Sequence, residues 1–202
     1  FASSDPTLKE RGIKGASNAS KLDKLVWDEF YNNWDAALIE SEKLLAKAQH
    51  TTVEKLNKVD VADLQKEGLD KERLIKTRVN QSIFRTMILA TYDNTCCMTG
   101  INNTELLIAS HIVPWSKDQK NRLNPTNGLC LNALHDRAFD KGLITISAKD
   151  YTIRVSSKLR KGNAIESVEY NFLKLEGREI SLPDKFLPAK EQLKIHNDFF
   201  IS

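Results

Sequence analysis

Hydrophobic and polar positions recur with different periods along the chain, and these periods predict its elements. From 23 to 49, apolar side chains recur at steps of three and four residues, which predicts one long amphipathic helix. The same spacing over 77–92 predicts a second helix. Residues 1–21 and 51–76 lack a clear period, so we expect a polar loop and a charged linker there.

The stretch from 106 to 142 predicts a strand, a loop, a second strand and a helix, in that order. Residues 106–113 are mostly apolar and suit a strand, which Pro114 ends. A turn signal precedes the short apolar segment 129–131. Residues 133–140 follow at once and can form about two helical turns. The pattern is therefore a hairpin joined to a short helix.

The remainder of the chain adds a second hairpin and a terminal helix. Apolar and polar residues alternate at period two over 143–146 and 151–155, with an Ala-Lys-Asp turn between them, which predicts paired strands. The pattern also allows a strand over 168–175, and it predicts a helix over 182–200. Helices combined with two antiparallel hairpins indicate an α+β fold.

Side chains suited to catalysis gather in the first hairpin and its helix. His111 ends the first predicted strand, while Asp136 and Asp140 are four residues apart and share one helix face. Packing the hairpin on the helix would bring an imidazole and two carboxylates together. An imidazole with a pKa of about 6.5 can serve as a general base, and paired carboxylates are hard ligands for an ion such as Mg²⁺. Phosphodiester hydrolysis uses such a base beside a metal ion.

The whole string of residues around this site resembles the HNH nucleases, the ββα-metal group, and in particular their restriction endonuclease branch. The matching segments are ASHIVPW at 109–115, Arg122, Pro125, NGLCL at 127–131 and DRAFDKGLI at 136–144. The preceding NQSIFRTMILATYDNTCCMTG, at 80–100, is similar to a helix of that branch followed by a Cys and a Thr-Gly pair. The resemblance implies a ββα-metal nuclease centre flanked by helices.

The resemblance also implies roles for individual residues. His111 matches the general base of the family, and Asn127 matches the asparagine that braces the hairpin and orients that base. For the metal, Asp136 is our first candidate ligand, Asp140 the second and His135 the third. The residue before the base is often Asp in this superfamily and ligates the metal, but here it is Ser110.

Charge near the site suggests where a nucleic acid would lie. The chain carries a net charge of +3 and has a pI of about 8.7, which permits nucleic-acid binding without requiring it. Close to the predicted site are four basic residues that we expect to hold DNA phosphates: Lys117, Lys120, Arg122 and Lys141. The expected partner is double-stranded DNA.

Cysteine usage and hydropathy bear on compartment and cofactor. The chain has three cysteines and no CxxC pair, a pattern typical of a reducing compartment and one that does not favour a structural zinc ion. No apolar run reaches the roughly 18 residues of a membrane-spanning helix, and no signal peptide is visible. We therefore expect a cytoplasmic protein without a membrane partner, whose cofactor is Mg²⁺ or Mn²⁺.

These observations predict two regions and one principal function. Residues 1–75 are expected to be a helical region and linker from a longer module, since the chain starts at Phe1 rather than Met, and residues 76–202 are expected to be the HNH nuclease domain. The predicted function is metal-dependent DNA cleavage in bacterial restriction or phage defence. An alternative, kept open by Ser110, is a nucleic-acid-binding module with a degenerate, non-cleaving centre. A homodimer would account for cleavage of both strands, with the long N-terminal helix as its interface.

Overall fold

The computed structural model describes residues 10, 12, 20–31, 33–60, 68–118, 121–161 and 166–200. The chain divides into two compact units, Phe1–Val53 and Glu54–Ser202, and each is described by itself. Among the described residues, no helix is both long enough and apolar enough to cross a membrane.

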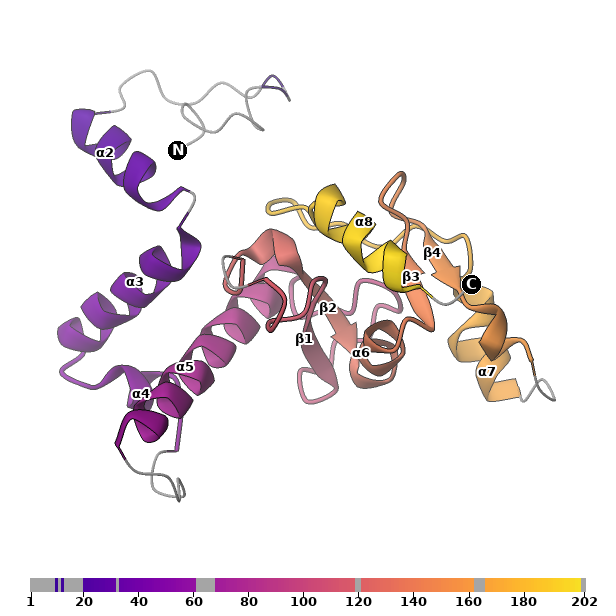
Figure 1. The fold of residues 1–202 in the computed structure, drawn as a ribbon, viewed down its shortest axis with the longest axis horizontal. Coiled ribbons are helices and arrows are strands. Elements are labelled where there is room, and N and C mark those ends of the chain that lie inside the picture. Colours follow the sequence, from indigo (N-terminus) through magenta and orange to yellow (C-terminus); the bar gives the residue numbers. More distant parts are fainter. Residues whose placement is uncertain are drawn as a thin grey trace. The chain divides into compact units, whose positions relative to one another are not determined.

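Where the sequence predicted one helix over 23–49, the described residues of the first unit form two (Figure 1). Helix α2 (Lys21–Phe30) begins with a capping box, in which Ser20 and Asp23 each accept a hydrogen bond from the other's backbone N–H. Helix α3 (Trp34–Ala48) begins after Asn33, whose side chain accepts a hydrogen bond from the Ala36 backbone N–H. This second N-cap lies inside the periodic stretch and starts a new helix there.

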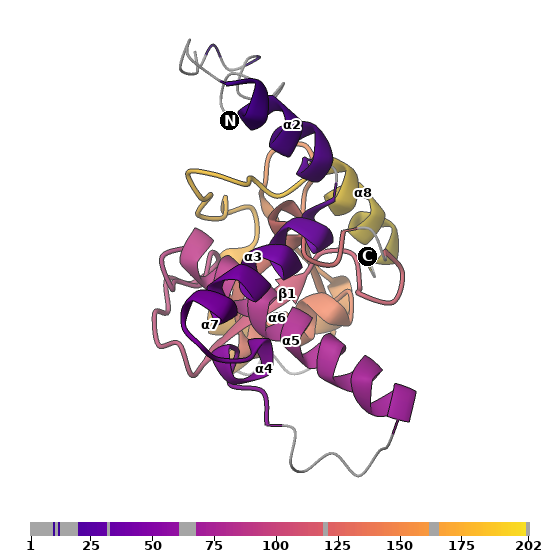
Figure 2. The ribbon, with the colours of Figure 1, turned by 90° about the vertical axis from the view of Figure 1, so that its left-hand side faces the viewer.

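The second unit begins with the short helix α4 (Val53–Leu56) and the long helix α5 (Gly68–Thr91). Helix α5 starts earlier than the sequence predicted, and it runs through the expected domain boundary at 75–76. Its buried face contributes apolar side chains to the core: Val79, Ile83, Phe84, Ile88 and Leu89. Helix α5 packs against the hairpin that is formed by residues 107–111 and 128–132, and Figure 2 shows it in front of this hairpin.

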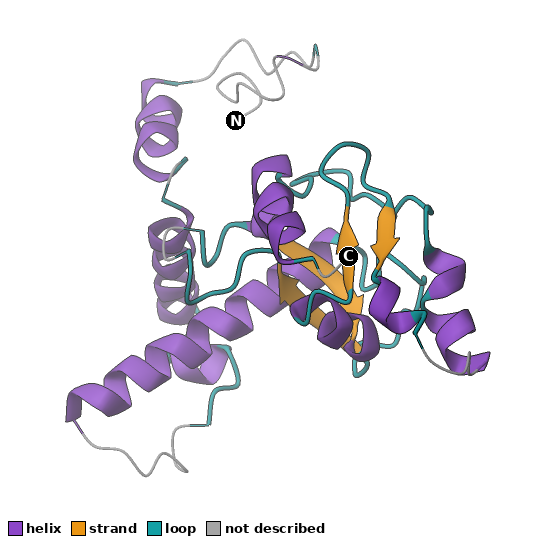
Figure 3. Cartoon of the chain, turned by 45° about the vertical axis from the view of Figure 1, so that its right-hand side comes forward, coloured by secondary structure: helices purple, strands orange, loops and turns teal. Residues whose placement is uncertain are grey.

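The predicted hairpin and helix are confirmed. Strand β1 (Leu107–His111) pairs antiparallel with β2 (Gly128–Asn132), and the short 3-10 helix η1 (Pro125–Asn127) leads into β2. Helix α6 (Ala133–Asp140) follows without a loop, because the Asn132 side chain accepts the His135 backbone N–H and caps the helix. Helix α6 packs against both strands (Figure 3).

One glycine sets how closely α5 approaches the hairpin. Gly128 lies opposite His111 in the strand register. A Cβ at this position would fall 2.2 Å from Ile88 Cδ1 and 2.9 Å from Phe84 Cζ, both on α5. Its backbone is ordinary extended structure, with a φ of −131°, so glycine is needed here for space and not for conformation.

The second hairpin also forms as predicted, from β3 (Ile144–Ile146) and β4 (Ile153–Val155). The strand that the pattern allowed over 168–175 is wrong, because these residues form helix α7 (Glu166–Asn171) and the 3-10 helix η3 (Leu173–Leu175). The outer edge of β4 is instead occupied by residues 177–178, which exchange backbone hydrogen bonds of 2.8 Å with Ile153.

The terminal helix is shorter than predicted. Helix α8 (Lys190–Phe199) begins after Pro188, whereas the prediction placed its start at 182. The segment before it contains two buried prolines, Pro183 and Pro188, which cannot donate backbone hydrogen bonds inside a helix. Helix α8 packs against β3 and thereby closes the core of this unit.

Candidate active site

His111 lies at the end of β1 and is half-buried. Its Nε2 is 2.9 Å from the backbone carbonyl oxygen of Arg122. Because a carbonyl oxygen can only accept, Nε2 carries the proton in the neutral ring and Nδ1 keeps a lone pair. Burial lowers the pKa of His111, although the hydrogen bond to Arg122 and the charge of Asp140 act to raise it. The ring is therefore neutral at neutral pH and able to accept a proton.

Aromatic side chains fix the plane of this imidazole. The ring of Phe84 stacks on His111, with centroids 3.7 Å apart and planes 12° apart. Trp115 meets the imidazole edge-on at 5.5 Å. The Arg122 side chain completes the arrangement, because its Nε donates to the Trp115 carbonyl oxygen at 3.1 Å and its guanidinium lies over the Trp115 ring. Neither Phe84 nor Trp115 was among the residues that the sequence predicted for the site, because an aromatic side chain on a helix or after a strand is typical of a core position.

Asn127 uses its side chain to brace the loop between the strands. Its Oδ1 accepts the Val113 backbone N–H at 2.9 Å, and its Nδ2 donates to the carbonyl oxygens of Val113 and Asn121. The residue is fully buried. These bonds tie the segment after His111 to the segment before β2, so Asn127 acts on the shape of the site and has no polar atom left for a substrate.

Two carboxylates of α6 face the end of β1. The charge of Asp140 acts on both His111 and Asp136, which places all three groups in one electrostatic cluster. Burial raises the pKa of Asp136, and the nearby Ser110 hydroxyl partly offsets this effect. That hydroxyl is buried, and the Asp136 carboxyl is the charged group beside it. Asp140 is exposed at the end of the helix.

This donor set suits a hard divalent ion. Mg²⁺ is usually bound through one or two carboxylates and keeps several water ligands, which is what Asp136 and Asp140 offer. A cation would relieve the repulsion between the two carboxylates, and the buried Ser110 hydroxyl adds an oxygen beside Asp136. Over the residues that the structure describes, no three His, Cys, Asp or Glu side chains form a complete metal-binding cluster.

His135 does not belong to this cluster. Its Nδ1 lies 2.9 Å from Asn132 Oδ1, and its Nε2 lies 2.6 Å from the Asn171 carbonyl oxygen. The side chain is buried, and both ring nitrogens face oxygen atoms of the protein. His135 therefore joins the start of α6 to α7, and its candidacy as a metal ligand does not fit its surroundings. The partner Asn171 is 36 residues away in the sequence, so no local pattern could have revealed it.

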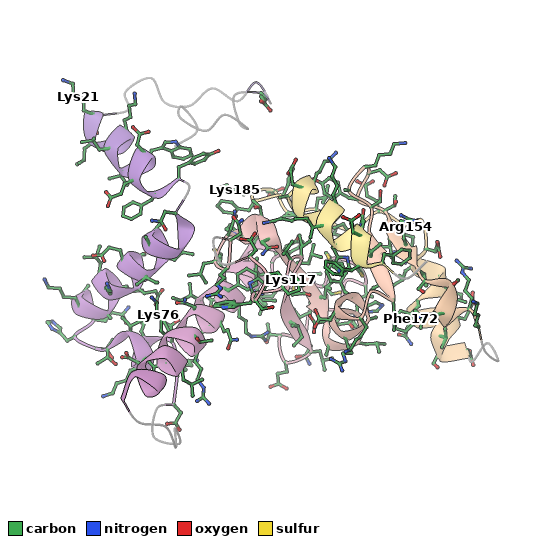
Figure 4. The ribbon with its side chains drawn as sticks, in the orientation of Figure 1. Lys21, Lys76, Lys117, Arg154, Phe172 and Lys185 are labelled. Atoms are coloured by element: carbon green, nitrogen blue, oxygen red, sulfur yellow. The ribbon has the colours of Figure 1, made fainter. Side chains whose placement is uncertain are left out.

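The four basic residues expected near DNA have different surroundings. Lys117 places its ammonium 3.6 Å from the centre of the Phe199 ring on α8, and Figure 4 shows it on the loop beside that helix. Arg122 is half-buried against Trp115, and Lys141 is exposed immediately after α6. The prediction for Lys120 lies outside the described residues. Among the three described residues, the Arg122 carbonyl contacts His111 and Lys141 directly follows Asp140, so both border the cluster.

The three cysteines lie in the core. Cys96, Cys97 and Cys130 are buried free thiols. The sulfur of Cys96 accepts a hydrogen bond from the Asn132 backbone N–H at 3.3 Å, so it supports the junction of β2 and α6. Burial raises the pKa of Cys130 to about 11, which keeps the free thiol protonated at neutral pH.

Comparison with known proteins agrees with this geometry. Residues 96–147 match the HNH_2 family model, described as HNH endonuclease. The matched segment contains β1, β2, α6 and the cluster of His111, Asp136 and Asp140. This match supports the HNH family and nuclease chemistry, for which the substrate is a nucleic acid and the cofactor is generally a divalent metal ion. No curated protein matched the chain.

Proposed function

We propose that this chain is a metal-dependent endonuclease acting on double-stranded DNA, with a restriction or phage-defence role in bacteria. One observation supports this most strongly. The Nε2 of His111 donates to the Arg122 carbonyl, which leaves Nδ1 as the proton acceptor at the end of β1, where Asp140 acts on the same ring. A neutral imidazole held in one tautomer beside carboxylates is the arrangement that general-base hydrolysis requires.

The chemical step uses His111 as the base. Nδ1 takes a proton from a water molecule while the water oxygen attacks phosphorus and forms the new P–O bond. The bond from phosphorus to the 3′ oxygen breaks, and the leaving oxygen takes a proton from solvent water, so the products carry a 5′ phosphate and a 3′ hydroxyl. Nε2 stays bonded to the Arg122 carbonyl, so the imidazolium that forms is stabilised without a change of ring position.

Asp136 and Asp140 are the residues we propose to hold Mg²⁺ or Mn²⁺. A bound ion would offset negative charge on the phosphate and the leaving oxygen. Ser110 supports Asp136 through its neighbouring hydroxyl. Substituting Asp136→Asn should weaken Mn²⁺ binding measured by calorimetry, a result that does not depend on DNA cleavage.

We propose that DNA phosphates are held by Arg122 and Lys141, with Lys117 further out on the loop. These side chains contact the backbone rather than the bases, so they would position DNA without reading its sequence. Neutralising Lys141 should weaken binding to unrelated DNA sequences by similar factors and reduce the salt dependence of binding.

Ser110 supports a second candidate function, a DNA-binding module that no longer cuts. A hydroxyl in place of a carboxylate removes one charge from the cluster, and a weakened metal site can leave DNA binding without cleavage. The two functions differ in their metal requirement, because the non-cleaving module should bind DNA equally well with and without Mg²⁺ or Mn²⁺.

Plasmid nicking tests the proposed function directly. The parent chain should nick supercoiled DNA with Mg²⁺ or Mn²⁺ but not with EDTA, and His111→Ala should lower the rate by roughly a hundred- to ten-thousandfold. His50→Asn is the matched control, since His50 is an exposed histidine of the first unit. Its φ is 50°, a conformation that Asn tolerates. Equal rates for His111→Ala and the parent would refute the role of His111.

The compartment and the assembly follow from the same proposal. Three buried free thiols suit a cytoplasmic protein. One centre per chain cuts one strand at a time, so we propose that two copies act together when both strands are cut. Light scattering at the concentration of the nicking assay tests this, and a monomer that still makes double-strand breaks in one encounter would contradict it.

A further inference from the structure

Phe84 is a residue of the core that also forms one wall of the candidate site. It lies on α5 with only 2% of its surface exposed. Its ring covers one face of the His111 imidazole, at 3.7 Å between centroids and 12° between planes. Trp115 and Arg122 come from the loop of the hairpin and Asp140 comes from α6, whereas Phe84 comes from a helix that precedes them all in the chain.

The chain makes room for this stack at one position. Gly128 is the partner of His111 in the hairpin, and a Cβ there would fall 2.9 Å from Phe84 Cζ. Since the φ of Gly128 is ordinary, the missing side chain serves only to admit α5. The short distance between Phe84 and the hairpin therefore depends on the absence of a side chain at Gly128.

Two restraints together define where His111 Nδ1 lies. The terminal torsion of a histidine side chain is broad and roughly two-fold, so a hydrogen bond alone allows the ring to tilt around its acceptor. The bond from Nε2 to the Arg122 carbonyl fixes one atom of the ring, and the parallel phenyl ring fixes its plane. When the hydrogen bond and the stack are both present, the lone pair of Nδ1 points in one direction only.

We propose that Phe84 is a positioning residue for His111, acting by holding the imidazole plane through the stack that Gly128 admits. This inference rests on the proposed function, because the ring it positions is the proposed base. The stack itself holds the imidazole plane in the free protein, whether or not the chain cuts DNA.

The test compares two matched substitutions in the full chain, Phe84→Leu and Phe172→Leu. Both replace a buried phenyl ring with an apolar side chain of similar size, and both rings neighbour a histidine. Phe172 packs on His135, away from the hairpin end. The measurements are the NMR shifts of the His111 ring protons, the tautomer of His111 from its ring nitrogens, and the kinetics of plasmid nicking.

The parent should show His111 ring protons shifted upfield by the stacked phenyl ring and an imidazole protonated at Nε2. Phe84→Leu should move those protons downfield and mix the two tautomers, while kcat falls roughly ten- to a hundredfold and KM changes little. Phe172→Leu should leave the His111 signals and kcat, measured below its melting temperature, at their parent values.

The outcomes separate the two proposals. Unchanged His111 signals and unchanged kcat in Phe84→Leu would overturn the positioning role. An equal effect from Phe172→Leu would also overturn it, since the loss would then come from general weakening of the core. If the parent chain fails to nick DNA while Phe84→Leu still moves the His111 signals, the proposed function fails and the positioning of the imidazole stands.

Discussion

His111 and His196 are packed alike but use their ring nitrogens differently. Each imidazole stacks on a phenyl ring: His111 on Phe84 at 3.7 Å, and His196 on Phe139 at 3.6 Å. Each also directs Nε2 to a backbone carbonyl oxygen, at 2.9 Å for His111 and 3.1 Å for His196. The difference lies at the other nitrogen.

The Nδ1 of His196 accepts a hydrogen bond of 2.7 Å from the Thr145 hydroxyl, which in turn accepts one from Asn197. No described residue forms such a bond with the Nδ1 of His111. The ring of His196 thus uses both nitrogens to join α8, β3 and the end of α6, whereas the ring of His111 keeps Nδ1 available. The comparison teaches that packing and one hydrogen bond fix an imidazole, and that the second nitrogen decides whether it acts on the fold or on a substrate.

Removing each ring should cost the fold a different amount of stability. His196→Ala should lower the free energy of unfolding by about 3 to 5 kcal/mol, because it leaves a cavity against Phe139 and unpaired groups at Thr145. His111→Ala should cost clearly less, since His111 is only half-buried. Urea unfolding followed by circular dichroism measures both. Similar losses for the two variants would remove the distinction drawn between these histidines.

The stability of the fold should depend on pH through His196. Burial lowers the pKa of His196 to about 4, below the ordinary value of 6.5. Between these values the unfolded chain binds a proton that the folded chain does not, so stability is complete above pH 6.5 and decreases as the pH falls. The expected loss by pH 4 is about 3 kcal/mol from this residue.

The control for this effect is His196→Gln, which keeps a polar side chain but cannot titrate. The pKa values of His111 and His135 are also lowered by burial, so they add to the loss in the same direction. The contribution of His196 is therefore the difference between the parent and His196→Gln in thermal melts from pH 7 to pH 4. Parallel pH profiles for the two proteins would contradict the assignment.

The parts of this molecule that the sequence predicted are those with local signals. The hairpin and α6 follow from a strand-ending proline, a turn before β2 and the N-cap Asn132, each within a few residues of its effect. His111, Asp136 and Asp140 could be predicted as site residues because their residue types and spacing suit the proposed chemistry.

The parts that were missed depend on contacts between distant segments. Phe84 looks like any other apolar position on a helix, and only the register of His111 opposite Gly128 places its ring in the site. His135 resembled a ligand until its bond to Asn171 was known. The strand expected near α7 failed because the edge of β4 was already paired with residues 177–178.

Gly128→Ala offers the finest test of the comparison, since it should disturb the His111 stack and leave the His196 stack intact. The new Cβ would press on Ile88 and Phe84, and overpacking of this kind costs about 1 to 3 kcal/mol. Adding Ile88→Ala removes the atoms at 2.2 and 2.8 Å, so the two changes should cost less together than the sum of their separate losses. Urea unfolding of the three variants and the parent measures this coupling.

Phe84 Cζ would remain 2.9 Å from the new methyl group in the double variant. Stability should therefore recover further than nicking does, because the shifted phenyl ring still tilts the imidazole of His111. Nicking that recovers in step with stability would show that only the overall packing matters. Nicking that stays low while the NMR signals of His196 keep their parent positions would show that the open nitrogen of His111 depends on the position of one phenyl ring.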